Sequence, residues 1–174
     1  RSSDLPHYDS KFFLDGVEIP LLYHFGGLKS TYNSEALEGI DFYPGGFGTR
    51  YGGATAGAIE ITGRPAKNDR WHGLLDMSMI DGSALVEGPV NEKVSILGTV
   101  RRSFAGDILG WYFENSSRSF PFTVTPFYWD YVLRSDFDLS KKHNAFLTFF
   151  GSRDSLAMHF PSLAGGSDEV SGSV

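Results

Sequence analysis

The 174-residue sequence contains no cysteine. This absence excludes disulfide frameworks, zinc sites built from thiolates, and catalysis by a cysteine nucleophile. No stretch approaches the roughly 18 apolar residues of a membrane-spanning helix. Basic residues are in the minority, with 15 Lys and Arg against 21 Asp and Glu, and the net charge is −6. The chain therefore lacks the basic surface expected of a general nucleic-acid binder, and we expect no nucleic-acid partner.

Motifs that carry covalent chemistry are also missing. There is no G-x-S-x-G elbow of a hydrolase, and the Gly-Gly pairs at 45–46 and 52–53 lack the Lys-Ser/Thr of a phosphate loop. The five histidines are never at a metal-ligand spacing. We therefore expect a protein that is not an enzyme, with no catalytic, cofactor-binding or metal-ligating residues.

Aromatic residues and glycine are abundant instead. Aromatics make up 15% of the chain, which also has 21 Gly, and 41% hydrophobic residues are enough for a folded core. Membrane β-barrels have such a composition, with aromatic girdles at both interfaces, and so do β-rich binding modules. Composition thus favours a β protein without choosing between these two classes.

From Trp71 onward, apolar and polar residues alternate with a period of two, which is typical of strands exposed to different surroundings on their two faces. The clearest segment, 127–139, places Trp129, Tyr131 and Leu133 on one face and Asp130 and Arg134 on the other. We expect about five strands here. Each is near the roughly 9–11 residues of a tilted membrane strand.

The connections between these strands differ in length. Residues 89–93 and 140–143 form short polar turns, whereas 104–126 and the tail after Asp154 read as long loops. Short turns at one rim and long loops at the other are typical of outer-membrane barrels. Asp81-Gly82, interpreted as a tight turn on the long-loop side, is the exception. In a soluble sandwich the same alternation would bury the apolar face in a core, so that alternative stays open.

Three segments of the first half resemble the plug of TonB-dependent receptors. They are Phe13-Leu14-Asp15-Gly16-Val17-Glu18-Ile19-Pro20, the run from Leu37 to Gly45, and Arg50-Tyr51-Gly52-Gly53-Ala54-Thr55-Ala56-Gly57-Ala58-Ile59-Glu60-Ile61-Thr62. They occur in the family's order and spacing, and a linker-like stretch and alternating strands follow them. The resemblance covers nearly the whole chain.

The resemblance implies a mainly β fold: part of a mixed α/β plug, followed by part of a transmembrane antiparallel β-barrel whose parent has about 22 strands. Residues 1–63 would be the C-terminal part of the plug, 64–70 a linker, and 71–174 the first barrel strands and loops. The implied function is ligand binding and energy-coupled uptake across the bacterial outer membrane. The implied partners are outer-membrane lipid, an unidentified ligand, and a TonB-type energy-coupling protein that engages a segment absent from this sequence.

Site residues follow from the same resemblance. Tyr23, His24 and Phe25 lead toward the plug apex and are candidates to face the ligand, although packing against the barrel wall is an equal alternative. Candidates for plug–barrel contact are Glu38, Asp41, Arg50, Glu60, Arg101 and Arg134. We expect Phe42, Ile59 and Ile61 to form one buried cluster in a plug sheet, with the charged residues outside it.

Two other functions remain compatible with the sequence. One is a soluble secreted β-rich binding module, which would use the aromatic residues to grip a partner. The other is a surface scaffold with receptor architecture that does not transport.

Overall fold

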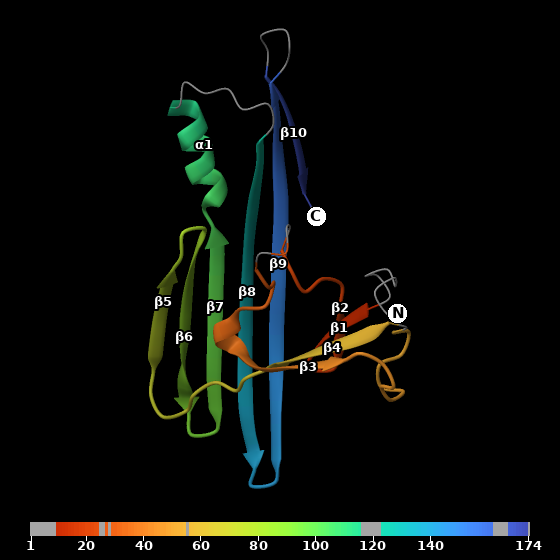
Figure 1. Ribbon diagram of the computed structural model, residues 1–174. Helices are drawn as coiled ribbons and strands as arrows, with labels where there is room; N and C mark the ends of the chain where they lie inside the picture. The colour runs from red at the N-terminus through yellow and green to blue at the C-terminus, as the bar shows by residue number, and fades with distance from the viewer. Residues whose placement is uncertain are drawn as a thin grey trace.

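The computed structural model describes residues 10–24, 27, 29–54, 56–115, 123–161 and 167–173. The chain is mainly β and forms two separate sheets, one of four strands and one of six. Figure 1 shows the smaller sheet lying across the larger one. Within the described residues neither sheet closes on itself. No helix in this part of the chain has the length and apolar character to cross a membrane.

The N-terminal sheet contains β1 (Ser10–Leu14), β2 (Val17–Ile19), β3 (Leu37–Tyr43) and β4 (Gly57–Gly63), in the order β2-β1-β4-β3. β1 runs parallel to β4, and the other pairs are antiparallel. Asp15 and Gly16 connect β1 to β2, and both have positive φ, 49° and 84°. Asp-Gly is the dipeptide that a two-residue hairpin of this type favours, because both central residues must adopt the left-handed region.

The second sheet, called the long sheet here, contains β5 (His72–Met77), β6 (Asp81–Asn91), β7 (Val94–Ser103), β8 (Thr123–Ser140), β9 (His143–Pro161) and β10 (Ser167–Ser173). Each strand pairs antiparallel with the next one in sequence. A helix, α1 (Ala105–Asn115), follows β7 and stands near the upper part of β8 (Figure 1).

Three sequence expectations are wrong in this half. The stretch 104–126 is not only a loop, because it contains α1 and the start of β8. The region after Asp154 continues β9 to Pro161 and then forms β10, so the sheet has six strands and not about five. The turn after β5 is formed by 78–80, and Asp81 already belongs to β6. Alternation in these segments was hidden by the mixed aromatic and polar composition of 104–126 and by the small residues of the tail.

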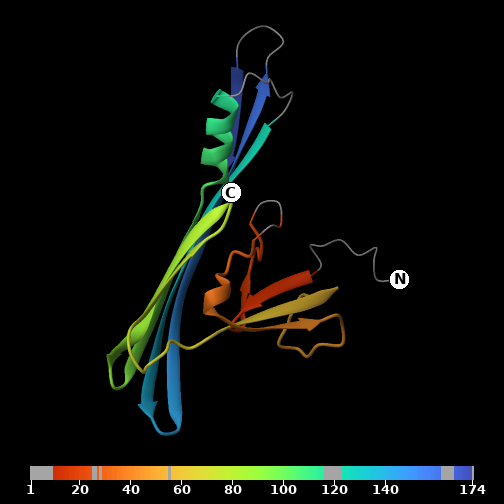
Figure 2. The same ribbon diagram turned by 60° about the vertical axis from the view of Figure 1, so that its left-hand side comes forward.

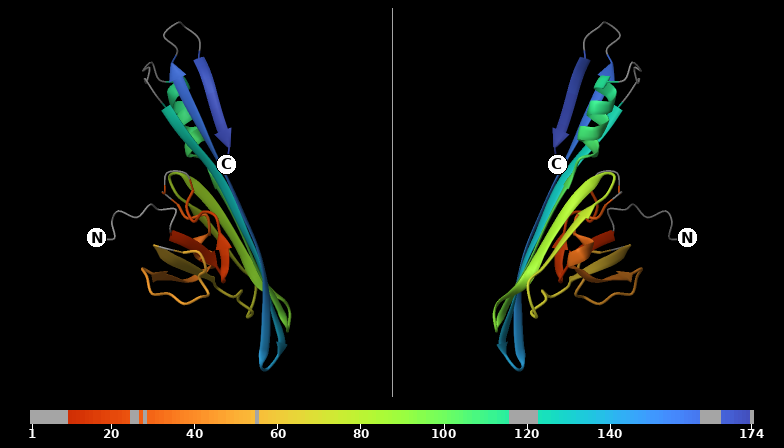
Figure 3. Two further views of the ribbon diagram at one scale, coloured as in Figure 1. Left: turned by 90° about the vertical axis from the view of Figure 1, so that its right-hand side faces the viewer. Right: turned by 90° about the vertical axis from the view of Figure 1, so that its left-hand side faces the viewer.

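The N-terminal sheet packs against one face of the long sheet. Figure 2 shows it on a single side, and Figure 3 shows β8, β9 and β10 extending well beyond it. The main apolar core lies between the two sheets, where Leu14, Leu22 and Ile61 meet Leu97 and Val132. The two sheets therefore share one core and do not form independent units.

A second, smaller cluster lies on the other face of the N-terminal sheet, where Phe13, Tyr51 and Ala58 pack together. The expectation of a buried cluster of Phe42, Ile59 and Ile61 is only partly met. Ile61 is buried and Ile59 is partly buried, but Phe42 is 64% exposed. Phe42 lies on the edge strand β3, so one side of its strand has no neighbour in the sheet.

Candidate functional site

The face of the long sheet that meets the N-terminal sheet carries many polar side chains around the apolar Leu85, Leu97 and Val132. Alternation along each strand brings a set of buried polar and charged side chains to this face: Asp81, Glu87, Ser95, Thr99, Arg101, Ser103, Asp130, Arg134 and Asp154. Buried charges are costly unless they are paired and hydrogen-bonded. The partners of these groups define the contact between the two sheets.

One part of this contact is the docking segment, residues 22–24 and 29–32. Its backbone folds back on itself, with the Thr31 amide donating to the Leu22 carbonyl at 2.7 Å and the His24 amide to the Lys29 carbonyl at 2.9 Å. Tyr23 and Ser30 form an isolated antiparallel bridge. This local pairing presents the side chains of His24 and Lys29 to the long sheet.

His24 is the centre of the docking segment and is almost fully buried. Its Nδ1 bonds the carboxylate of Asp154 on β9, and its Nε2 lies 3.0 Å from Oδ2 of Asp130 on β8. The ring stacks on Tyr128, with centroids 4.3 Å apart and planes 19° apart. His24 thus joins two adjacent strands.

Neighbouring groups extend this network to two more strands. Arg101 on β7 donates from Nε to Oδ2 of Asp130 at 2.7 Å and from Nη2 to the Ser30 carbonyl. Lys29 Nζ lies 3.4 Å from Oδ2 of Asp81 on β6, and that oxygen also accepts from the Tyr128 hydroxyl at 2.6 Å. The docking segment is therefore tied to β6, β7, β8 and β9.

A second group of contacts fixes the chain that follows β4. Arg64 donates both terminal nitrogens to Glu87 on β6, at 2.7 and 2.9 Å, and the Lys67 amide donates to the same carboxylate at 3.0 Å. Bidentate pairing with arginine restricts geometry more than a single contact does. The first part of the expected linker 64–70 is thus held against the long sheet, at Arg64 and Lys67.

Arg134 forms a third group of contacts, between β8 and the N-terminal sheet. Its Nη1 donates to the Gly63 carbonyl at 2.9 Å and lies 3.5 Å from Asp15 Oδ2, while Nε donates to Asp136 at 2.9 Å. The Gly63 amide in turn donates to Asp15 Oδ1 at 3.0 Å. Asp15 therefore bridges its own sheet and Arg134 of the other.

Tyr32 is buried beside these groups. Its hydroxyl has no hydrogen-bond partner among the described residues. Burial, with the Asp15 carboxylate as the second cause, raises the pKa of Tyr32 to about 12. The neutral hydroxyl of Tyr32 lies against Gly63, the residue that ends β4.

Gly63→Ala is expected to weaken the contact between the sheets. A Cβ there would lie 2.6 Å from the Tyr32 hydroxyl and 3.0 Å from Arg134 Nη1, so one of these groups must shift. Overpacking of this kind costs about 1–3 kcal/mol. Urea denaturation should show the lower midpoint. Gly39→Ala on the neighbouring strand β3 is the matched control, because nothing lies within 4 Å of its Cβ position. Equal midpoints for the two variants would contradict this packing.

The structure separates the residues expected to contact the ligand. Tyr23 is 46% exposed, His24 is buried against the long sheet, and Phe25 lies outside the described residues. For His24 the arrangement is the packing alternative that the sequence left open.

The expected plug–barrel contact residues also divide. Arg101 and Arg134 lie between the sheets, whereas Glu38, Asp41 and Arg50 are exposed. The expectation that Glu60 lies on the outside is wrong: it is buried, accepts from Arg50 at 2.7 Å and accepts from the Tyr51 hydroxyl.

The physical reason is the alternation of β4. Ile61 faces the long sheet, so Glu60 points away from it, toward the loop that carries Arg50 and Tyr51. The hydrogen bond to Glu60 is the largest cause that raises the pKa of Tyr51. Glu60 therefore binds Arg50 and Tyr51 on the far side of the N-terminal sheet.

Sequence reasoning missed most partners of Arg101 and Arg134. They are Asp15, Ser30, Gly63, Asp130 and Asp136. The alternation along β8 does point to two of these partners, because Asp130 and Asp136 share a face with Arg134 in the sequence pattern. No comparable signal identifies backbone acceptors such as the Ser30 and Gly63 carbonyls.

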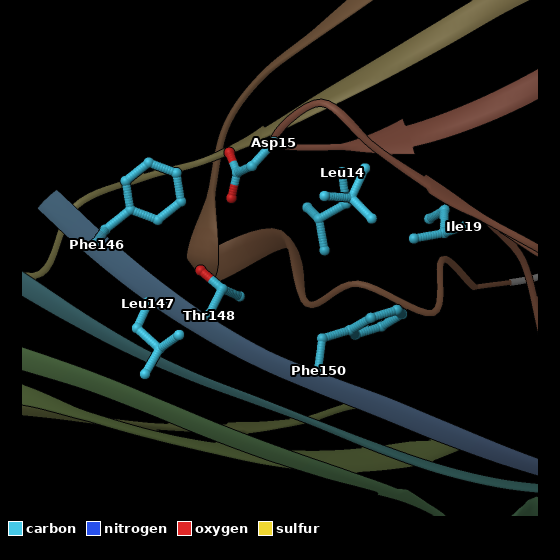
Figure 4. Close-up of a pocket in the computed structure, with 8 residues that line it drawn as sticks. Leu14, Asp15, Ile19, Phe146, Leu147, Thr148 and Phe150 are labelled. Atoms are coloured by element: carbon cyan, nitrogen blue, oxygen red, sulfur yellow. The ribbon is translucent and has the colours of Figure 1, made fainter. Parts of the chain in front are cut away.

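A pocket of about 300 Å³ lies between the β1–β2 hairpin and β9. Figure 4 shows Leu14, Ile19 and Phe150 around it, with Asp15 at one side. Asp15 is already engaged by Gly63 and Arg134. A binding site usually combines an apolar lining with several convergent polar groups. We therefore interpret this pocket as a gap between the two sheets.

Comparisons with known proteins find similarity in fold and not in sequence family. No family model matches the chain, and no curated protein matches it. Among solved structures, the chain resembles the siderophore receptor PirA from Acinetobacter baumannii, with a TM-score of 0.52 and 18% identity. The match covers 95% of this chain and 31% of that chain, so the present chain spans about a third of its length. The chain therefore has a receptor-like β fold.

Proposed function

We propose that this chain is part of a TonB-dependent receptor of the bacterial outer membrane, which binds a ligand and takes it up by moving a plug, without covalent chemistry. The long sheet is part of the wall of a transmembrane β-barrel, and the N-terminal sheet is part of the plug inside it. The motif resemblance of the first half supports this proposal. So does the receptor-like β fold, which extends over both sheets.

The observation that carries the proposal is the polarity of the long sheet. The face toward the N-terminal sheet carries buried charged and polar side chains around the apolar Leu85, Leu97 and Val132, whereas the opposite face, called the open face here, carries exposed apolar side chains. Large hydrophobic side chains on the open face, 40% to 82% exposed, are Leu75, Met77, Val86, Val100, Tyr131, Leu133, Leu147 and Phe149. A water-soluble sandwich buries the apolar face of its sheets, and monomeric soluble proteins rarely expose a continuous apolar patch beyond a few hundred Å². A sheet with lipid outside and a polar lumen inside has this arrangement.

The height of the apolar face fits a membrane. On β8 it runs from Trp129 to Leu139, which is about 33 Å along the strand at roughly 3.3 Å per residue and about 25 Å in height for a strand tilted by about 40°. Barrel proteins show an apolar band about 25 Å tall, with aromatic girdles at its limits. Trp129 stacks with Tyr131 at one limit, with centroids 5.9 Å apart. The short turns 91–93 and 140–142 lie beyond the other.

The contact between the sheets fits a plug that must move. Around the apolar core, the docking segment, Arg64 and Asp15 hold the N-terminal sheet through ion pairs and hydrogen bonds. Water in a barrel lumen can replace such bonds as they break, whereas a wholly apolar interface would expose hydrophobic surface. In this proposal the ligand binds on the side of α1, and an energy-coupling protein of the inner membrane displaces the plug.

Planar-bilayer conductance tests the proposal. The intact protein should show little conductance, because the N-terminal sheet fills the lumen. A variant of the whole receptor that lacks the entire plug, including residues 10–63, should open a pore with a large, steady conductance. Equal low conductance for both forms, with both inserted in the bilayer, would contradict a plug. A scaffold that does not transport would still pass this test and would instead fail to accumulate ligand in energised cells.

A further inference from the structure

Two arginines lie in one row across the open face of the long sheet. Arg102 on β7 pairs in register with Trp129 on β8, and Trp129 pairs with Arg153 on β9. The preceding Arg101 and the following Asp154 are both buried against the N-terminal sheet. Because side chains alternate along a strand, Arg102, Trp129 and Arg153 all point to the open face.

The exposed apolar residues of the open face are called the apolar band here. The row of Arg102, Trp129 and Arg153 lies at one end of this band. One step inward along that face come Val100 and Tyr131, which are exposed and belong to the band. Cationic side chains are expensive at the middle of a membrane but are accommodated near its surface, where Trp and Tyr also gather. The row therefore sits at the level of lipid headgroups if the long sheet spans a membrane.

The two guanidinium groups have little compensating charge. The Arg102 side chain is 66% exposed, lies 5.2 Å from the centroid of the Phe127 ring, and is 3.5 Å from the exposed carboxylate of Asp107. Exposed ion pairs of this length contribute little. Arg153 is exposed and has no ion-pair partner among the described residues. Two cations thus face one weakly held anion.

We infer that Arg102 and Arg153 bind the phosphate of a phosphorylated lipid headgroup in the membrane leaflet on the side of α1. This inference rests on the proposed function, since it requires the open face to contact lipid. Guanidinium groups match phosphate oxygens with paired hydrogen bonds. Two strand spacings separate the Cα atoms by about 10 Å, so long arginine side chains can converge over Trp129. Trp129 then packs against the headgroup and the upper acyl chain.

The opposite limit of the sheet supplies a matched control. Lys141 and Lys142 are exposed in the turn between β8 and β9, beyond the other end of the apolar band. Replacing both removes the same charge as replacing both arginines. Any effect of replacing the two lysines on lipid binding would reflect the net charge of the protein and not a specific site.

Native mass spectrometry of the protein extracted from its membrane in a mild detergent tests the inference. The probes are a phosphorylated glycolipid, the same glycolipid after removal of its phosphates, and inorganic phosphate. Each arginine near an anionic headgroup contributes about fivefold in affinity. The double variant R102Q/R153Q should therefore bind the phosphorylated lipid roughly 30-fold more weakly, while K141Q/K142Q should match the unmodified protein.

The possible outcomes test the lipid site and the proposed function separately. Loss of binding in R102Q/R153Q alone, with weak binding of the dephosphorylated lipid and of free phosphate, supports the site. Equal binding by all forms, an equal loss in K141Q/K142Q, or equal affinity for the dephosphorylated lipid overturns it while leaving the membrane wall intact. Absence of the protein from the membrane fraction overturns the proposed function and the inference with it.

Discussion

Asp130→Ala should release the docking segment from the long sheet. Asp130 is fully buried; its Oδ2 accepts from Arg101 Nε and lies 3.0 Å from Nε2 of His24. Removing one partner of a buried ion pair leaves an uncompensated buried charge and costs about 3–5 kcal/mol. The amides of His24 and Thr31, which donate within the docking segment, should then exchange with solvent about a hundredfold faster or more.

Hydrogen exchange measured by mass spectrometry or NMR would show this effect. Asp138→Ala is the matched control, because Asp138 lies on the same strand and removes the same charge but is exposed. Its exchange pattern should stay unchanged. If Asp130→Ala leaves the docking segment as protected as Asp138→Ala does, the polar network does not hold the two sheets together.

The second large effect concerns the open face. Leu133 lies midway between Trp129 and Phe137 and is 44% exposed. Replacing an exposed leucine with arginine in a soluble protein usually changes stability by less than about 0.5 kcal/mol. On the lipid face of a barrel near the midplane, the same change costs about 2–4 kcal/mol. Leu133→Arg should therefore sharply reduce the folded, membrane-inserted fraction.

The folded fraction can be measured by the mobility shift between heated and unheated samples on a denaturing gel. Leu139→Arg is the control, since Leu139 shares the strand and the open face but lies at its end, next to the β8–β9 turn. A charge near the interface costs about 0–1 kcal/mol. Equal tolerance at the two positions would contradict a membrane wall, because only a membrane makes the cost depend on depth.

The long strands could be predicted from the sequence because their alternation is strong. In β8 the alternation places Trp129, Tyr131 and Leu133 on the open face and Asp130 and Arg134 on the other, as the pattern indicated. Helix α1 could not be predicted in this way. Its exposed Trp111 and Tyr112 resemble the aromatic residues of a loop, in a stretch without period-two alternation.

The contact between the sheets was harder to predict than the strands. The alternation along the strands places Arg101 and Arg134 on the face toward the N-terminal sheet, but it does not identify the groups that they contact. Arg134 meets Asp15 and a backbone carbonyl of a strand that ends 71 residues earlier. Such partners depend on how the two sheets dock, and docking is a tertiary property that local pattern does not contain. Glu60 was misplaced for the same reason, since its partners lie in a loop on the far face.

The most direct test of the central claim is to measure what the open face of the long sheet contacts. The chain has no cysteine, so single-cysteine variants carry one spin label without background. Labels at Leu133 and Val100 should collide readily with oxygen, which dissolves in lipid, and hardly at all with a water-soluble nickel complex. A label at Lys141, in the β8–β9 turn, should show the reverse. If the nickel complex reaches Leu133 and Val100 as readily as it reaches Lys141, the open face lies in water and the membrane wall is contradicted.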